Sequence, residues 1–125
     1  MREIRVKDLI IRDVVTASPE EILALAKLKM MRLGIGGLPV VENRNLVGMI
    51  THRDTILAGE RAMNLRVQDI MTSKVRAIRE DTTLREVVTI MKETGYQRLP
   101  VVSRGELVGI VTQSCIINAL AEELK

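Results

Sequence analysis

Aromatic residues, cysteine and histidine are almost missing from this 125-residue chain. With one Tyr, no Phe and no Trp, any core must be aliphatic, and seven Met residues are available to fill irregular gaps in it. The single cysteine, Cys115, cannot form an intrachain disulfide. The single histidine, His52, nearly excludes a histidine-based triad or a His-rich metal site. We therefore expect no catalytic residue and no metal ligand.

Long apolar runs are missing as well. No stretch approaches the roughly 20 apolar residues that a membrane-spanning helix needs. The first eight residues carry charges of both signs and have no apolar segment of the kind found in a secretion signal. We expect a cytoplasmic protein that does not contact a membrane.

The excess of positive charge is small. The formal net charge is +3, and acidic and basic residues alternate along the chain rather than forming one basic cluster. The pI near 9.4 permits contact with phosphates. Nucleic-acid binding remains an alternative function, but the chain lacks the aromatic residues on which bases commonly stack. A salt titration of RNA or DNA binding would distinguish this alternative.

The most informative feature is an internal repeat. When the sequence is shifted by 61 residues, 14 positions are identical between residues 6–55 and 67–116 without any gap. The shared segments include Leu38–Val41 with Leu99–Val102, and Leu46–Gly48 with Leu107–Gly109. Such a register is typical of a tandem duplication. We place the first repeat at residues 1–62 and the second at 63–125, with a short link near 63–66.

Each repeat is predicted to fold as strand, helix, strand, strand, helix. In the first copy we expect a β-branched strand at 14–16 and a helix that opens at Ser18–Glu21, with Ser18 as its cap, and ends at Gly34. In both copies a hairpin and a last helix follow. The expected ranges are 38–41, 46–50 and about 51–61 in the first copy, and 75–78, 83–94, 99–102, 107–111 and 113–123 in the second. One such unit would leave a sheet face bare, and packing two units face to face would bury it.

These paired segments resemble the CBS domain, named after cystathionine beta-synthase. The motifs that carry the resemblance are Leu-Pro-Val-Val and Leu-Val-Gly-x-x-Thr in both copies, together with Val67–Thr72. The resemblance covers about residues 6–120. It implies an α+β fold: a tandem pair of CBS domains, each β-α-β-β-α, packed sheet to sheet around a pseudo-twofold axis. It further implies a stand-alone, two-repeat regulatory module that is not an enzyme.

The resemblance also implies two clefts between the repeats that bind AMP, ADP, ATP, S-adenosylmethionine or a related adenosyl ligand. Such a ligand is regulatory, so no cofactor is expected. The output would pass to an effector protein, whose identity the sequence does not give. A homodimer is also expected, because several apolar residues of the last helices exceed what one small module must bury. These residues are Ile56, Leu57, Ile116, Ile117 and Leu120.

The first-copy segment Thr51-His52-Arg53-Asp54 has a physical case of its own. Thr51 and Asp54 lie three residues apart on the first turn of a helix, so they share one face. The Asp54 carboxylate could accept hydrogen bonds from two ribose hydroxyls, and Arg53 is a further phosphate candidate. The alternative is structural, with Thr51 capping the helix and Asp54 favouring its positive end. The family resemblance favours the ligand-binding interpretation.

In this family, one repeat's Thr-x-x-Asp pairs with residues of the other repeat. The matching residues here lie around 74–78 and 96–100. Arg98 stands where many relatives have a phosphate-binding residue, and a guanidinium can hold phosphate oxygens bidentately. The alternative is that Arg98 is a solvated charge at the entrance of the hairpin. The remaining predicted ligand-site residues of the second repeat are Val75, Arg76, Ala77, Gln97, Leu99 and Pro100.

The second cleft departs from the family pattern. Cys115 occupies the aspartate position after Thr112, and a thiol is a poor partner for a ribose diol. Gly37 stands where the other cleft has Arg98. We predict a degenerate cleft that lacks both the acid and the base, with residues Thr16, Gly37, Leu38, Thr112 and Cys115.

Overall fold

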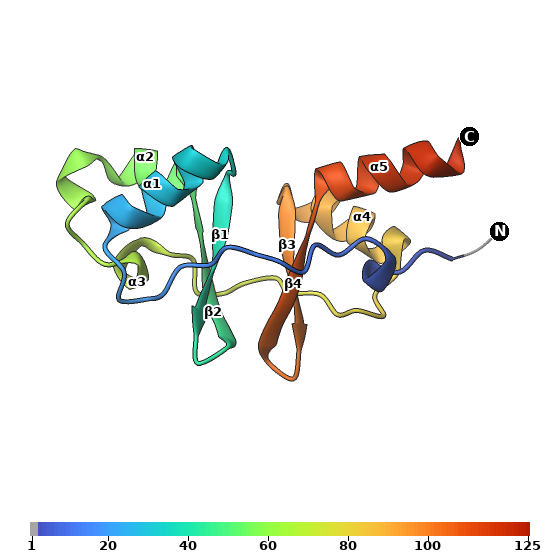
Figure 1. Cartoon of the computed structure of the whole chain (residues 1–125), viewed down its shortest axis with the longest axis horizontal. Coiled ribbons are helices and arrows are strands. Elements are labelled where there is room, and N and C mark those ends of the chain that lie inside the picture. The colour runs from blue at the N-terminus through green and yellow to red at the C-terminus, as the bar shows by residue number, and fades with distance from the viewer. Residues whose placement is uncertain (1–2) are drawn as a thin grey trace. The chain divides into compact units, whose positions relative to one another are not determined.

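The computed structural model describes residues 3–125, which form two compact units (Figure 1). One unit consists of residues 15–75 and is called here the first-copy unit. The other combines residues 76–125 with the segment that ends at Val14, and is called the second-copy unit. The first two residues of the predicted first repeat lie outside the described range.

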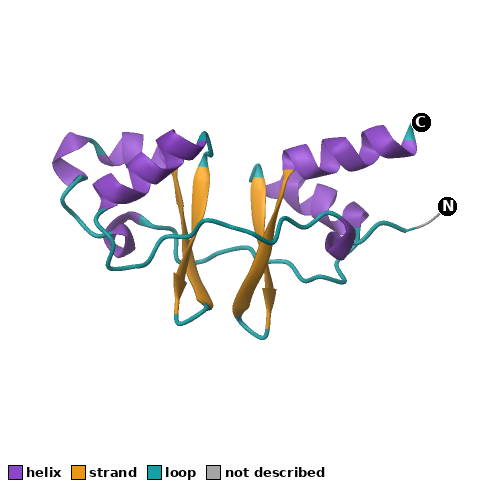
Figure 2. Cartoon of the chain, viewed as in Figure 1, coloured by secondary structure: helices purple, strands orange, loops and turns teal. Residues whose placement is uncertain are grey.

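The first-copy unit contains one antiparallel hairpin, β1 (Gly37–Glu42) and β2 (Asn45–Thr51), with helices beside it (Figure 2). The longest helix is α1 (Leu23–Leu33), and α2 (His52–Ala58) follows β2 directly. Two short elements complete the unit, the 3₁₀ turn η2 (Glu60–Ala62) and the single-turn helix α3 (Val67–Ile70).

The second-copy unit repeats this plan. Its hairpin is β3 (Arg98–Ser103) with β4 (Glu106–Thr112), and its helices are α4 (Leu84–Thr94) and α5 (Gln113–Glu123). A 3₁₀ turn, η1 (Val6–Asp8), belongs to this unit although it precedes the first repeat's hairpin in sequence. The predicted α+β fold with two related copies is therefore confirmed.

Both hairpins form where the sequence predicts them. Their two-residue turns place Asn43 and Arg44 at φ of 50° and 71°, and Arg104 and Gly105 at 53° and 82°. Two successive residues with positive φ match the right-handed twist of the flanking strands. Asn43 and Gly105 tolerate this conformation well, whereas Arg44 and Arg104 adopt it at some steric cost.

The start of the first helix was predicted too early. Helix α1 begins at Leu23, with Ile22 at its N-cap. Ser18 and Glu21 form a separate turn instead, in which the Glu21 N–H donates to the Ser18 C=O over 3.2 Å. In the second copy the predicted start is confirmed, because Thr83 caps α4 and Glu86 completes a capping box.

The strands predicted at 14–16 and 75–78 are also not regular strands. Each copy has one isolated parallel bridge at this place, between Ala17 and Val40 or between Ile78 and Val101. Ile78, for example, donates to the Pro100 C=O and accepts from the Val102 N–H, both over 2.9 Å. Because the N–H and the C=O of this one residue are both hydrogen-bonded to the hairpin, a strand of several residues is not required. The helix predicted to reach residue 61 ends at Ala58, because Gly59 adopts φ of +83°.

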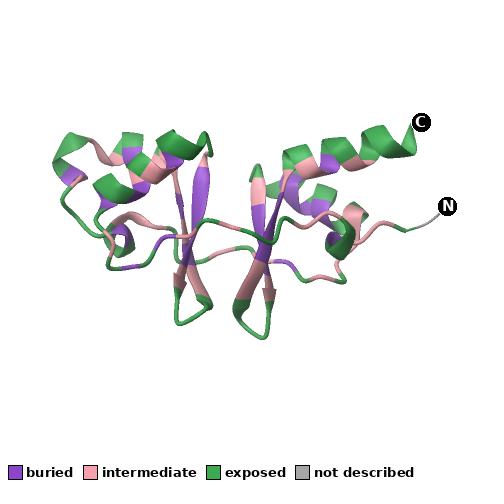
Figure 3. Ribbon diagram, in the orientation of Figure 1, coloured by how far each residue is buried: buried purple, intermediate pink, exposed green. Residues whose placement is uncertain are grey.

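The two cores each contain a residue that the sequence assigns to the opposite repeat. Val6 is fully buried with Leu99, Val101 and Val111 of the second copy. Val67 is fully buried in the first-copy core, together with Leu23, Leu38, Val40 and Ile50. The buried faces of helices and hairpins that form these cores are visible in Figure 3. Short segments are therefore exchanged between the sequence repeats.

Two arginines hold the exchanged segments at equivalent places. The Arg66 guanidinium donates to the Glu20 C=O over 2.8 Å in the first-copy unit. The equivalent Arg5 donates to the Asp81 C=O over 2.6 Å in the second-copy unit. The compact units thus divide the chain at 14/15 and 75/76, whereas the repeated sequence places a boundary near residues 62 and 63.

The shared Leu-Val-Gly motif has a steric explanation. A Cβ at Gly48 would lie 2.6 Å from Met71 Sδ, and one at Gly109 would lie 2.6 Å from the Ile11 carbonyl oxygen and overlap Ile10. At these places an exchanged segment crosses the hairpin. Thr72 and Met49 exchange two backbone hydrogen bonds of 2.9 Å, and Ile11 and Ile110 do the same. Only glycine permits this close approach.

Candidate functional site

Thr51 and Asp54 interact as a reciprocal capping box at the start of α2. The Thr51 N–H donates to Asp54 Oδ2 over 2.9 Å, and the Asp54 N–H donates to Thr51 Oγ1 over 3.1 Å. The structural interpretation of this pair is therefore realised. The capping box leaves two hydrogen-bonding groups available. Within residues 3–125, no donor contacts Asp54 Oδ1, and no acceptor contacts the proton of the Thr51 hydroxyl. Both side chains are only half-buried.

Thr112 and Cys115 form the same arrangement at the start of α5, with sulfur in place of the carboxylate. The Cys115 N–H donates to Thr112 Oγ1 over 3.3 Å, and the Thr112 N–H donates to Cys115 Sγ over 3.5 Å. The thiol and the hydroxyl lie 3.2 Å apart. Cys115 thus reproduces the cap of the first copy without its negative charge.

Arg98 is the first residue of β3, and its Cα is paired with that of Thr112. Its side chain is half-buried, and burial lowers the pKa of the guanidinium below its ordinary value. Across the described part of the chain, no carboxylate lies within ion-pair distance of this guanidinium. A buried charge without a partner is unfavourable, so Arg98 is well suited to an external anion.

The other predicted ligand-site residues fall into both units. Arg53 is exposed on α2, and Val75 is half-buried at the end of the first-copy unit. Arg76 and Ala77 begin the second-copy unit, and the Gln97 C=O accepts from the Gln113 N–H over 3.0 Å. Leu99 and Pro100 are buried, and the Pro100 C=O already accepts from the Ile78 N–H over 2.9 Å.

The predicted residues of the second cleft are similarly divided. Thr16, Gly37 and Leu38 belong to the first-copy unit, where Gly37 is the strand partner of Thr51. Leu38 is fully buried in the core. The structure therefore brings together Gly37 with Thr51, and Arg98 with Thr112. Joint binding of one ligand by Thr51, Asp54 and Arg98 combines residues of both units and stays a prediction.

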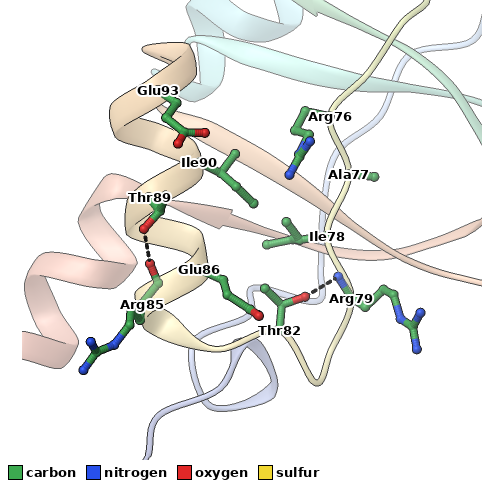
Figure 4. Close-up of a pocket in the computed structure, with 10 residues that line it drawn as sticks. All are labelled: Arg76, Ala77, Ile78, Arg79, Thr82, Arg85, Glu86, Thr89, Ile90 and Glu93. Atoms are coloured by element: carbon green, nitrogen blue, oxygen red, sulfur yellow. Dashed lines mark hydrogen bonds between the residues drawn. The ribbon is translucent and has the colours of Figure 1, made fainter.

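A groove lies wholly within the second-copy unit; of the residues that line it, only Arg76 and Ala77 were predicted from the sequence to contact a ligand. It runs between α4 and the extended segment that precedes it, with a volume of about 490 Å³ (Figure 4). Buried Ile78 and Ile90 line it, and Figure 4 shows Arg76, Glu86 and Glu93 turned toward it. A signal was present in the repeat alignment, because Ile90 replaces the lysine found at position 29.

Apolar side chains remain exposed on α2 and α5. Leu57 is 73% exposed and Ile117 is 64% exposed, as expected for residues that another surface could cover. Ile116 was grouped with them, but it is 7% exposed and packs in the second-copy core. The reason is the helical period: a step of one residue turns the side chain by about 100°, so that Ile116 faces the core while Ile117 faces outward.

None of the helices described is both long enough and apolar enough to cross a bilayer.

Three comparisons place the chain among known proteins. It is 43% identical over 109 residues to inosine-5'-monophosphate dehydrogenase from Korarchaeum cryptofilum, a match that covers 86% of this chain but 22% of the dehydrogenase. A Methanocaldococcus jannaschii protein described as a proposed archaeal homologue of γ-AMPK superposes with a TM-score of 0.87 at 30% identity, over 94% of this chain and 48% of the other. CBSX2, solved in complex with AMP, has a TM-score of 0.89 at 24% identity over 98% of this chain and 99% of the other, which bears on the fold alone.

The chain therefore spans only a part of the first two of these proteins. The sequence profile of the CBS domain matches twice, at residues 6–60 and at 67–122. Together these matches cover most of the chain and both copies of the observed fold. The protein belongs to the CBS domain family and is built as a tandem CBS pair.

Proposed function

We propose that this CBS pair is a regulatory module that binds an adenine nucleotide or another adenosyl ligand and has no catalytic activity of its own. AMP, ADP, ATP and S-adenosylmethionine are the candidate ligands. The observation that carries the proposal is Arg98, a half-buried guanidinium without an acidic partner among residues 3–125. An anionic ligand would supply the missing countercharge, and a phosphate fits the guanidinium bidentately.

The Thr51–Asp54 pair supports the adenosyl part of the proposal. Its Asp54 Oδ2 is engaged by the Thr51 N–H, which holds the carboxylate in one orientation. Oδ1 can then accept from a ribose hydroxyl, and the Thr51 hydroxyl can donate to a ligand oxygen. The cap therefore orients the groups that a ribose would contact rather than competing with them.

A regulatory role agrees with the relatives. The M. jannaschii relative is described as a γ-AMPK homologue, and the dehydrogenase match covers only a fifth of that enzyme. A regulatory module must bind its ligand differently in two states, since otherwise the ligand shifts nothing. We therefore propose that the signal passes to an effector protein or through a homodimer of this chain.

Calorimetry with AMP and adenosine tests the phosphate contact. Arg98→Ala should weaken AMP binding by roughly 10- to 100-fold, the effect of one charge-assisted contact, and leave adenosine binding nearly unchanged. The matched control is Arg104→Ala in the exposed turn of the second hairpin, which should affect neither ligand. An unchanged ratio of AMP to adenosine affinity in Arg98→Ala would reject the assignment of Arg98.

The ribose contact is tested separately with Asp54→Asn, which keeps an oxygen for the Thr51 N–H. AMP and adenosine should both lose affinity by a similar factor, because both contain the ribose. Cys115→Ala should affect binding far less. Equal losses in Asp54→Asn and Cys115→Ala would contradict the proposed asymmetry of the two copies.

A further inference from the structure

The groove beside α4 has a counterpart in the first-copy unit that is already filled. There the Lys29 side chain reaches from α1 to the extended segment, and its Nζ donates to the Thr16 C=O over 2.8 Å. The same Nζ donates to Glu21 Oε1 over 2.9 Å and lies 2.8 Å from Oε2. Both side chains are largely buried, at 27% and 12% exposure. An aliphatic chain that ends in an ammonium group is therefore the natural occupant of this place in the fold.

In the second copy no lysine fills the equivalent place, but the backbone C=O that would accept from its ammonium is still present. The repeat register replaces Lys29 by Ile90, Glu21 by Thr82 and Thr16 by Ala77. Ile78 directs its N–H and C=O toward β3, so the backbone groups of the adjacent Ala77 face the other way, where Ala77 lines the groove. Within residues 3–125, no hydrogen bond reaches the Ala77 C=O.

The charges around the open groove differ from those of the first copy. Arg76 replaces Val15 and Glu93 replaces Arg32, which brings a cation and an anion to a floor formed by Ile78 and Ile90. Figure 4 shows the Arg76 guanidinium and the Glu93 carboxylate directed toward the groove, whereas Arg79 and Arg85 point away from it. Across the described chain, neither Arg76 nor Glu93 takes part in an ion pair.

We propose that this groove binds a free aliphatic amino acid. Its carboxylate would pair with Arg76, and its ammonium would bond to Glu93 and the Ala77 C=O, as the Lys29 ammonium does at Thr16. Its side chain would cover Ile78 and Ile90. The volume of about 490 Å³ is within the range of small-molecule sites. All of these residues belong to the second-copy unit. Arg76 and Ala77 were also predicted for the adenosyl ligand, whereas Ile78, Ile90 and Glu93 were not, and the adenosyl proposal itself rests on Asp54 and Arg98.

Nuclear magnetic resonance titration of the whole 14.0 kDa chain tests the proposal. L-leucine should shift the Ala77 amide and the Ile78 and Ile90 methyl resonances in a saturable manner. Two analogues each lack one charge: 3-methylbutylamine has no carboxylate, and 4-methylpentanoate has no ammonium. Each should bind at least about tenfold more weakly than leucine, because each loses a charge-assisted contact. Equal binding of leucine and either analogue would overturn the proposal, as would no shift at leucine concentrations on the order of 10 mM, where millimolar sites are occupied.

Variants locate the site and separate it from nucleotide binding. Glu93→Gln should weaken leucine by about tenfold, whereas Glu106→Gln at the exposed start of β4 should not. Ile90→Lys should place an ammonium at the Ala77 C=O, as in the first copy, and abolish leucine binding. If that variant fails to fold, Glu93→Gln still decides. Glu93→Gln should also leave AMP affinity unchanged, because Glu93 is not among the residues predicted to contact the adenosyl ligand. Unchanged leucine affinity in Glu93→Gln would show that the groove is not the site.

Discussion

Gly109→Ala should detach the exchanged segment from the second-copy hairpin. The added Cβ would lie 2.6 Å from the Ile11 carbonyl oxygen and would overlap the Ile10 side chain. Because the nearest polar atom belongs to the backbone, a rotamer change cannot relieve the contact. The segment must move, and its movement breaks the two 2.9 Å hydrogen bonds between Ile11 and Ile110.

The cost follows from these contacts. Two backbone hydrogen bonds contribute about 1 kcal/mol each, and inserting a methyl group into a packed place costs about 1–3 kcal/mol. We therefore expect Gly109→Ala to lower the free energy of unfolding by about 3–5 kcal/mol. Urea unfolding measures the loss, and limited trypsin digestion after Arg12 reports whether the segment has been released.

Gly95→Ala provides the matched control. Gly95 has φ of +76° but open space around its Cβ position, so the substitution should cost about 1 kcal/mol through backbone strain alone. It should leave cleavage after Arg12 unchanged. A Gly109→Ala protein that is as stable as Gly95→Ala, with Arg12 equally protected, would refute the steric argument.

Three further predictions concern the cores, the caps and self-association. Val6→Ala should perturb methyl resonances of Leu99 and Val111, and Val67→Ala those of Leu23 and Leu38, each at a cost of about 2–3 kcal/mol; the reverse pattern would contradict the segment exchange. Cys115→Asp should strengthen the α5 cap and raise stability by about 0.3–1 kcal/mol, measured as a higher urea midpoint; a lower midpoint would show that the thiol is the better cap. Light scattering should report a dimer at micromolar concentration that Leu57→Glu weakens, and a monomeric parent chain would reject self-association.

Much of the fold was predictable because it depends on local patterns. The hairpins follow from apolar pairs on either side of Asn43-Arg44 and Arg104-Gly105, which adopt the positive φ values that such turns need. Helix α4 begins where Thr83 and Glu86 form a capping box. In the first copy the Ser18–Glu21 pattern misled, because the same residue types also stabilise an isolated turn.

The segment exchange and the groove could not be read from local patterns. Val6 and Val67 occupy equivalent positions of the repeat, and the neighbouring residues do not indicate which hairpin each valine packs against. The repeat identity of Asp8 and Asp69 gave a partial signal, since the Asp69 carboxylate accepts from the Arg66 N–H, and Asp8 from the Arg5 N–H. The groove depends on which side chain crosses from helix to edge segment, and that is decided by packing rather than by motif.

For the site, the sequence identified the Thr51–Asp54 pair and its Thr112–Cys115 counterpart, and the structure shows both as capping boxes. The structural role of Thr51–Asp54 was weighed from spacing alone, and that of Thr112–Cys115 was not anticipated. The ligand-binding role of Thr51, Asp54 and Arg98 rests on family resemblance and on the missing acidic partner of Arg98. Residue spacing could not predict that Arg98 lacks an acidic partner, because this depends on where all nearby carboxylates lie in the folded chain.

The exchanged segments also determine the order in which the protein can fold during synthesis. Residues 15–75 contain every part of the first-copy unit, so that unit can close once Thr72 has left the ribosome. Residues 4–11 are made earlier, yet their partners at Ile78, Leu99 and Ile110 emerge roughly 70–100 residues later, about 4–20 s at ordinary rates of translation. During that interval Val6 and Ile10 have no core to enter. Residues 4–11 are therefore made before either hairpin but are buried only after the second hairpin has formed, and they stay accessible to proteases and chaperones in the meantime.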